Sequence, residues 1–280
     1  FALVRNTSRF DQSKFNGEVK LIEGDLLKEV QLPKEIDIAY YLVHSMGGSD
    51  DFAKLEAQTA NSFVSAINST NTKQIIYLGG ISNADNLSKH LSSRHNVEKI
   101  LAEANCHLTV LRAAIIIGSG SASFEMIRDL VEKLPVMLTP RWLNTRCEPV
   151  SIANVIQYLT GVIGQEQAYG KVFDIGGPDI LNYKQMLQGY AKVRGLERLM
   201  IPVPFLSIGL SSYWLYFITS INFNLAKSLV TSLVNEVICE NLGIDQIVPI
   251  QPYSYQIALE RALAVSSSDT LISSWKDSLV

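Results

Sequence analysis

The chain has 280 residues, of which 47% are hydrophobic and 18% are charged, and this composition excludes an intrinsically disordered protein. Its 24 Lys and Arg residues against 27 Asp and Glu give a formal charge of −3 without blocks of like charge, which argues against nucleic acid as the main partner. The three cysteines, Cys106, Cys147 and Cys239, lie far apart and form no Cys-x-x-Cys pair. We therefore expect no disulfide scaffold and no metal site, and a reducing, cytoplasmic compartment.

Apolar runs rich in β-formers alternate with stretches of helical periodicity along the first 180 residues. Helices are expected over Ala53–Asn68 and Val97–Glu103. Continuous apolar runs such as Ile115–Ile117 are typical of a parallel sheet covered on both faces, and right-handed crossovers then give a doubly wound α/β layer. The expected strands are Phe1–Val4, Val19–Ile22, Ile36–Val43, Gln74–Leu78, Leu108–Ile117 and Val172–Ile175.

The second half of the chain has a different character. After Gly120 the strand-like runs are more widely spaced, prolines recur, and helical stretches dominate. The sequence predicts a Rossmann-like domain over residues 1–120 and a smaller, mostly helical substrate lobe over 121–280, in which 150–180 returns to the sheet.

One segment of this half carries no charge. From Pro202 to Ala226 no charged residue occurs, and four aromatic residues cluster between Tyr213 and Phe217. The length suffices for a bilayer span, but two prolines, Gly209 and many Ser, Thr and Asn residues dilute its apolar character. We expect a buried or pocket-lining segment over 202–226, with membrane association as the alternative.

The stretch from Gln74 to Ser121 carries a family likeness. A strand-like QIIYLGG leads to a helix-like SRHNVEKILAEA and then to a second strand-like run, HLTVLRAAIIIGSGS. This β-loop-α-β unit resembles the cofactor-side core of the atypical (extended-type) short-chain dehydrogenase/reductases, in particular their NAD(P)H-binding, NmrA-like and complex-I-39-kDa-like branch. The resemblance implies a Rossmann-like fold, a nicotinamide dinucleotide and a small-molecule substrate in the C-terminal lobe.

The glycine-rich first turn of that family has no counterpart here. If Phe1–Arg5 is the second strand of the fold, then roughly 30 residues, comprising the first strand, the Gly-rich turn and a helix, are expected to be missing upstream. The sequence thus predicts an N-terminal truncation, and a Rossmann-like sheet that lacks its first strand.

Two short motifs match the adenosine side of the family's cofactor site. By resemblance, Arg5 at a strand end would meet the 2′-phosphate of NADP and so favour NADP over NAD, with Asn6 and Ser8 as additional donors. Asp25 would accept from the adenine amino group and Leu26 would pack on the ring. The alternatives are a solvated arginine and an ordinary Gly-Asp turn.

The nicotinamide side rests on two further strand ends. By resemblance, the turn of Val43, His44 and Ser45 would run beneath the ribose and nicotinamide, and Gly79 and Gly80 would border the cofactor. The family usually places serines there, one of which polarises the substrate carbonyl. Gly80 has no hydroxyl to do so.

The catalytic Tyr-x-x-x-Lys of the family is replaced by His90-Leu91-Ser92-Ser93-Arg94. Arg94 can keep the positive charge and the ribose contacts, but it does not act as an acid or base. His90 has a suitable pKa to donate a proton to a carbonyl or quinone oxygen. The resemblance therefore implies an NADP(H)-dependent reductase of a carbonyl or quinone, and the altered triad leaves a non-catalytic dinucleotide sensor or assembly subunit as the alternative.

The expected substrate lobe holds three further features: a glycine-rich turn, two arginines and a cysteine. Residues 118–123 imitate a Gly-x-Gly-x-x-Gly fingerprint with Ser123 in the third position, and we assign them to a turn that opens the substrate cleft. Arg141 and Arg146 either hold an anionic or quinone-like group or place charge at the edge of the lobe. Cys147 has no base at a known spacing, which argues against a nucleophile.

Overall fold

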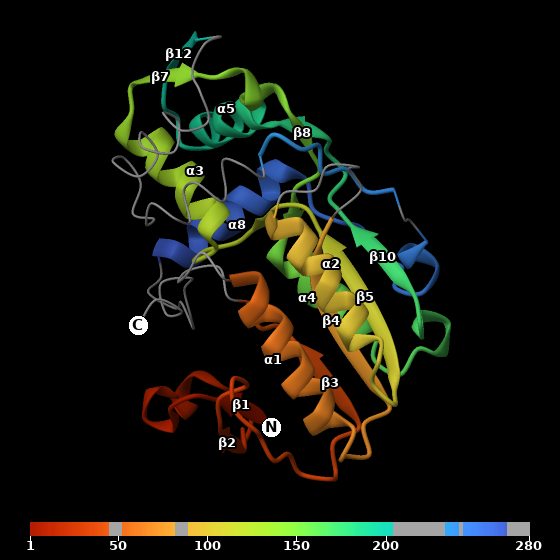
Figure 1. Ribbon diagram of the computed structural model, residues 1–280. Coiled ribbons are helices and arrows are strands. Elements are labelled where there is room, and N and C mark those ends of the chain that lie inside the picture. The colour runs from red at the N-terminus through yellow and green to blue at the C-terminus, as the bar shows by residue number, and fades with distance from the viewer. Residues whose placement is uncertain (45–51, 82–88, 204–232, 241–242, 268–280) are drawn as a thin grey trace.

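The computed structural model describes residues 1–44, 52–81, 89–203, 233–240 and 243–267 (Figure 1). Its centre is a four-stranded parallel sheet of order β10-β5-β4-β3. These strands span Ile38–Tyr41 (β3), Gln74–Gly80 (β4), His107–Ala113 (β5) and Val172–Ile175 (β10). Parallel neighbours need crossover connections, and helices supply them here.

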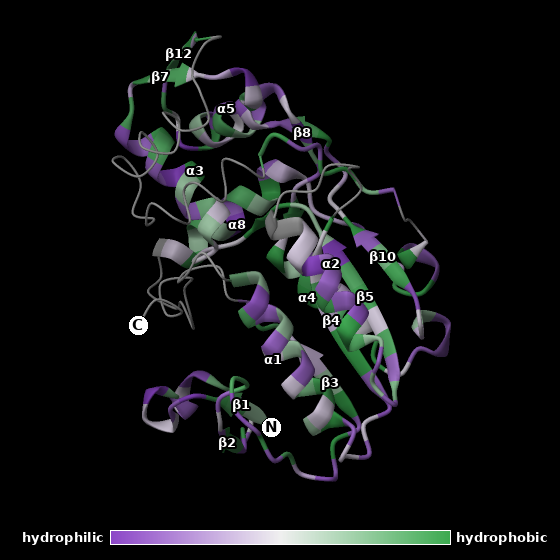
Figure 2. Cartoon of the chain, viewed as in Figure 1, coloured by the Kyte–Doolittle hydropathy of each residue, from purple (hydrophilic) through white to green (hydrophobic). Residues whose placement is uncertain are grey.

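Helices cover both faces of this sheet, as expected for a doubly wound fold. Ile75 and Tyr77 of β4 pack in a core cluster with α1 (Phe52–Ile67) and α2 (Lys89–Leu101), while the intervening Ile76 packs in a cluster on the opposite face with α4 (Ile152–Gly161). Successive strand residues point to opposite faces, so apolar side chains at consecutive positions fill both layers. Figure 2 shows much of β4 in the green of apolar residues.

A second, two-stranded parallel sheet holds β1 (Ala2–Val4) and β2 (Leu21–Glu23), next to β3 in Figure 1. In the classic Rossmann order the first strand lies between these two groups. Within the described residues no strand joins β1 to β3, and the two sheets meet through side chains of one core cluster, to which Leu3 and Leu26 contribute.

The prediction of one continuous strand over Leu108–Ile117 was wrong. β5 ends at Ala113, whose partner Gly80 is the last residue of β4, so the strand has no neighbour beyond that point. The chain bends at Ala114, and the short β6 (Ile116–Ile117) pairs instead with β9 (Val150–Ser151).

The remaining elements form a lobe beyond the sheet, with its own apolar cluster. Its helices α3 (Ala122–Lys133), α5 (Tyr183–Val193) and α8 (Tyr255–Ser267) pack together. Its short sheets pair β7 (Val136–Thr139) with β12 (Leu199–Pro202) in parallel and β8 (Arg146–Cys147) with β11 (Leu181–Asn182) antiparallel. Short 3₁₀ helices lie at Thr7–Arg9, Gln12–Lys14, Arg141–Asn144, Glu166–Ala168 and Ile244–Gln246.

Candidate functional site

Arg94 lies at the centre of the region that the sequence predicts to face the nicotinamide. Its side chain is nine-tenths buried, and its Nη1 lies 3.1 Å from Nε2 of His44, which follows β3. Because a guanidinium only donates, Nε2 accepts and the imidazole proton resides on Nδ1. The Nε of Arg94 lies 4.0 Å from Oε1 of the buried Glu56 of α1, and Ser93 donates to Oε2 of that carboxylate at 2.5 Å. Arg94 is therefore held between an acid and an imidazole.

Two buried tyrosines border this arginine. Burial raises the pKa of Tyr41 and that of Tyr77 to about 12, and the neighbouring Arg94 opposes both shifts. Tyr41 also shares a hydrogen bond of 3.1 Å with the hydroxyl of Thr59. A reductase tyrosine that works as an acid needs a lowered pKa. Burial shifts the pKa of both tyrosines in the opposite direction.

A second buried ion pair lies on the same face of the sheet. Glu98 of α2 accepts two hydrogen bonds from Arg112 of β5, at 2.9 and 2.6 Å, and this carboxylate raises the pKa of the arginine. Arg112 stands in register between Gly79 of β4 and Asp174 of β10. A Cβ on Gly79 would lie 3.3 Å from Oε1 of Glu98, so glycine leaves room for the ion pair. Glu56 and Glu98 were not predicted, because a carboxylate on a helix is usually solvated.

The predicted adenosine-side residues gather at the end of the two-stranded sheet. Arg5 is exposed, and Oδ1 of Asn6 accepts from the main-chain N–H and the hydroxyl of Ser8, at 2.9 and 2.7 Å. Thr7 donates to the carboxylate of Glu23 at 2.8 Å, and that hydrogen bond holds the pKa of Glu23 below its usual value. The loop therefore presents a cation, hydroxyls and one acid to solvent.

Asp25 and Leu26 form a turn directly after β2. Oδ1 of Asp25 accepts from the N–H of Leu27 at 3.0 Å, the geometry of an Asx turn. The side chain of Leu26 is buried in the core cluster of the sheet. The structure thus places Leu26 inward, and the predicted adenine contacts of both residues stay predictions.

Other predicted residues reach the same region to different degrees. Val43 is exposed, and Gly80 pairs in register with Ala113. Ser45 lies outside the described residues, as does the side chain of His90, whose main chain belongs to α2. Positions 90 and 94 are four residues apart on this helix and so share one of its faces.

The substrate-lobe residues are separate from this cluster. Arg141 is exposed, whereas Arg146 forms a two-bond ion pair with Glu236 at 2.8 and 3.0 Å. Cys147 is fully buried, and burial raises the pKa of its thiol to about 12. Ser121 caps α3 by accepting from the N–H of Phe124 at 3.2 Å. Most of the segment 202–226 lies outside the described residues.

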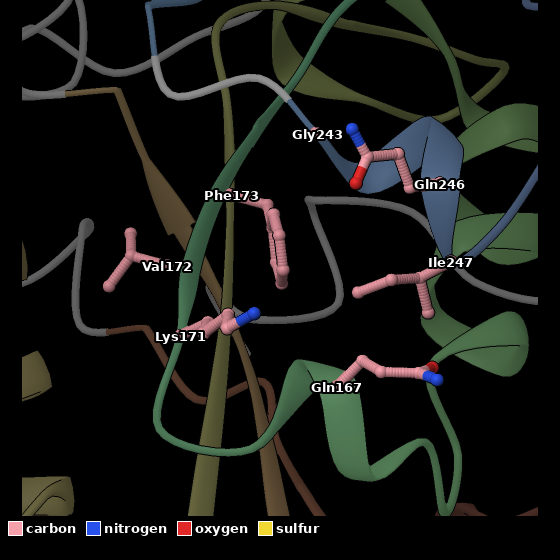
Figure 3. Close-up of a pocket in the computed structure, with 7 residues that line it drawn as sticks. All are labelled: Gln167, Lys171, Val172, Phe173, Gly243, Gln246 and Ile247. Carbon is pink, nitrogen blue, oxygen red and sulfur yellow. The ribbon is translucent and has the colours of Figure 1, made fainter.

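A cavity of about 610 Å³ lies at the opposite end of the sheet. Figure 3 shows Phe173 and Ile247 converging on it from β10 and from the segment after the 3₁₀ helix Ile244–Gln246. Lys171 precedes β10, so the cavity adjoins the amino end of that strand, whereas parallel α/β sheets bind ligands at the carboxyl ends. It is therefore not part of the candidate site. Its lining residues are Gln167, Lys171, Val172, Phe173, Gly243, Gln246 and Ile247.

No family model and no curated protein matches this chain. Solved structures do match: a nucleoside-diphosphate-sugar epimerase from Staphylococcus aureus has a TM-score of 0.70 at 15% identity, with 92% of this chain and 89% of that one covered. The triphenylmethane reductase of Citrobacter sp. in complex with NADP(H) matches with a TM-score of 0.68 at 14% identity, and the match covers 92% of this chain and 89% of that one. The NADPH-dependent quinone oxidoreductase of Escherichia coli matches with a TM-score of 0.66 at 14% identity, and the match covers 88% of this chain and 84% of that one.

The chain has a Rossmann-like fold. At these identities the likeness concerns the fold alone, and it confirms the predicted α/β class and the Rossmann-like fold that the resemblance implied. The neighbours carry several activities on one architecture, so the activity has to be argued from the site.

Proposed function

We propose that this protein binds NADP(H) and transfers hydride to a small carbonyl or quinone substrate in the C-terminal lobe. The observation that carries the proposal is the position of Arg94, a buried guanidinium held at the carboxyl ends of β3 and β4 by His44 and Glu56. Ligands of parallel α/β sheets bind at that edge, and a guanidinium there can donate to ribose hydroxyls.

The choice of NADP over NAD rests on the loop after β1. Arg5 is exposed there, beside Asn6 and Ser8, and a guanidinium fork matches phosphate oxygens. The solved neighbours named with NADP(H) and NADPH support a nicotinamide dinucleotide as the ligand class. Glu23, the last residue of β2, accepts from Thr7 of this loop and carries negative charge, so Arg5 has to outweigh it for a 2′-phosphate to bind.

In the proposed reaction His90 donates the proton. It lies one helical turn before Arg94, the spacing that tyrosine and lysine have in the resembled family, and an imidazolium can protonate the oxygen of a reduced carbonyl or quinone. The dinucleotide would supply the hydride. The chain's own residues would bind and orient it, with Arg94 on the ribose and the main chain of Gly79 and Gly80 bordering the ring.

The altered triad supports a second function. Gly80 stands where a serine would polarise the substrate carbonyl, and buried tyrosines of raised pKa flank Arg94. A site with these features can bind a dinucleotide without turnover, and the protein would then be a sensor or assembly subunit whose partner surface depends on cofactor occupancy.

Calorimetric titration with NADPH and NADH tests the cofactor assignment. We expect NADPH to bind more tightly, and Arg5→Glu to remove most of that preference while leaving NADH binding within about twofold. Lys14→Glu makes the same charge change in the neighbouring 3₁₀ helix and serves as the matched control. If neither NADPH nor NADH binds, the proposal is overturned.

Turnover then separates the two functions. With a quinone panel and NADPH, His90→Ala should lower kcat by about 100-fold or more if His90 is the proton donor, while the Kd for NADPH stays constant. Binding of NADPH without measurable turnover in the unaltered protein would favour the sensor or assembly role instead.

A further inference from the structure

The far end of the lobe carries four exposed aliphatic side chains on one small sheet. We name them the apolar ribbon: Val136 and Leu138 of β7, and Leu199 and Ile201 of β12, with exposed fractions of 45%, 38%, 60% and 41%. Val136 pairs in register with Leu199, and Leu138 with Ile201, so the four side chains project from the same face as two adjacent pairs. Figure 2 shows both strands green at the tip of the lobe.

The opposite face of the same strands is anchored in the protein. Met137 is 1% exposed and belongs to the core cluster of the lobe, and Met200 packs against that cluster. Thr139 is buried as well. The ribbon is therefore a fixed surface of the lobe, and the exposure of its outer side chains follows from the pleat of well-packed strands.

Positive charge flanks the ribbon at both ends. The stretches 133–144 and 192–203, which contain β7 and β12, hold five cations and one acid, Glu197. Lys133 and Arg194 form ion pairs with acids outside these stretches. Arg198 donates to main-chain carbonyls, and Arg141 and Lys192 make no ion pair within the described part of the chain. The five cations are Lys133, Arg141, Lys192, Arg194 and Arg198.

We propose that the apolar ribbon docks on an anionic lipid surface. Interfacial binding needs apolar side chains that insert at the headgroup boundary and cations that attract anionic lipids, and the ribbon with its flanks presents both. The order along the parallel strands suits this use: Lys133 and Arg198 precede the ribbon, and Arg141 follows it. No helix among the described residues is long and apolar enough to cross a bilayer.

Charge favours a lipid surface over a second copy of this chain. Two copies that met ribbon to ribbon would bring Arg141, Lys192 and Arg198 of one copy against the same three cations of the other. Lys133 and Arg194 are balanced by Asp129 and Glu132, and Glu197 is the one further acid of these stretches. An anionic surface meets the same charge pattern with attraction. The proposal does not depend on the cofactor assignment, since the ribbon belongs to the lobe alone.

Vesicle co-sedimentation of the full chain tests the proposal. Binding to phosphatidylcholine vesicles that contain phosphatidylglycerol should exceed binding to phosphatidylcholine alone. Leu199→Asn with Ile201→Asn should weaken it by about tenfold or more, because the inserted area is lost. The matched control is Ile156→Asn with Ile180→Asn, two side chains of 53% and 52% exposure elsewhere on the surface, which should leave binding unchanged.

A second variant tests the contribution of the flanking cations to vesicle binding. Arg141→Gln with Lys192→Gln should lower binding to the anionic vesicles and make it less sensitive to salt. Equal binding by the ribbon and control variants would overturn the proposal, as would no binding to either vesicle. Sedimentation equilibrium covers the remaining outcome: a dimer that dissociates in the ribbon variant, without vesicle binding, would assign the surface to self-association and also overturn the proposal. Circular dichroism melts show whether each variant is folded.

Discussion

Arg112 holds both carboxylate oxygens of Glu98, at 2.9 and 2.6 Å, across the interface between β5 and α2. Both side chains are largely buried, and a Cβ added to Gly79 would crowd the same carboxylate. The pair therefore fixes the helix that carries His90 and Arg94 relative to the end of β4. A structural ion pair thus sets the geometry of the candidate site.

Removal of one partner of that pair should be costly. We expect Glu98→Gln to lower the free energy of unfolding by about 3 kcal/mol, because a buried guanidinium loses its compensating charge. Urea denaturation measures the change. Glu236→Gln is the matched control, since Arg146 and Glu236 have the same two-bond geometry on an exposed surface, where such pairs contribute about 0–1 kcal/mol. Equal losses in the two variants would show that burial does not govern these pairs.

Arg94 and Glu56 should show coupling in a double-mutant cycle. Arg94→Met leaves the buried Glu56 carboxylate with its Ser93 hydrogen bond but without the arginine, whereas Arg94→Met combined with Glu56→Gln removes both charges. We expect the double variant to recover about 1–3 kcal/mol relative to the sum of the single losses. Additive losses from chemical denaturation would indicate that the two groups, 4.0 Å apart, do not interact energetically.

Alkaline pH should destabilise the fold through its buried tyrosines. Burial raises the pKa of Tyr77 from 10.0 to about 12, so between these values the unfolded chain has lost a proton that the folded chain keeps. Stability is then fully present below pH 10 and decreases as pH rises toward 12. Tyr77→Phe should remove about 2–3 kcal/mol of this decrease. Denaturation series at neutral and alkaline pH measure the free energy of unfolding of both proteins. If it decreases equally steeply with pH in the unaltered protein and in the variant, Tyr77 does not titrate as inferred.

Gly118 should tolerate no side chain unless its neighbour is shortened. A Cβ there would lie 2.7 Å from Cγ2 of Ile152, the first residue of α4. We expect Gly118→Ala to lower the melting temperature, with a loss of about 1–3 kcal/mol. The second substitution Ile152→Gly should restore most of it, because it removes both Cγ2 and the Cβ, which would lie 2.8 Å from the added atom, and Ile152 is itself 41% exposed. Failure of the double variant to recover would place the cost in the backbone of the turn.

The sequence predicted the fold more fully than the site. Alternation of apolar runs such as Gln74–Gly80 with amphipathic helices follows local periodicity, and the structure has strands and helices there. The break after Ala113 was missed because it depends on where the neighbouring strand ends, which no local pattern records. Glu56 and Glu98 were missed for a related reason: they become buried through tertiary contacts with Arg94 and Arg112.

The separation of β1–β2 from the main sheet has a consequence for affinity. The small sheet is joined to the rest through core side chains and through Gln58, which donates to the carbonyl of Leu27 at 3.2 Å. A dinucleotide that contacted both Arg5 and Arg94 would connect two sheets between which the described residues form no main-chain ladder. Part of its binding free energy would go into holding them in one arrangement, and amide exchange in β1 and β2 would slow on binding. A variant that holds the two sheets more firmly together would therefore bind the dinucleotide more tightly, without any new contact to it.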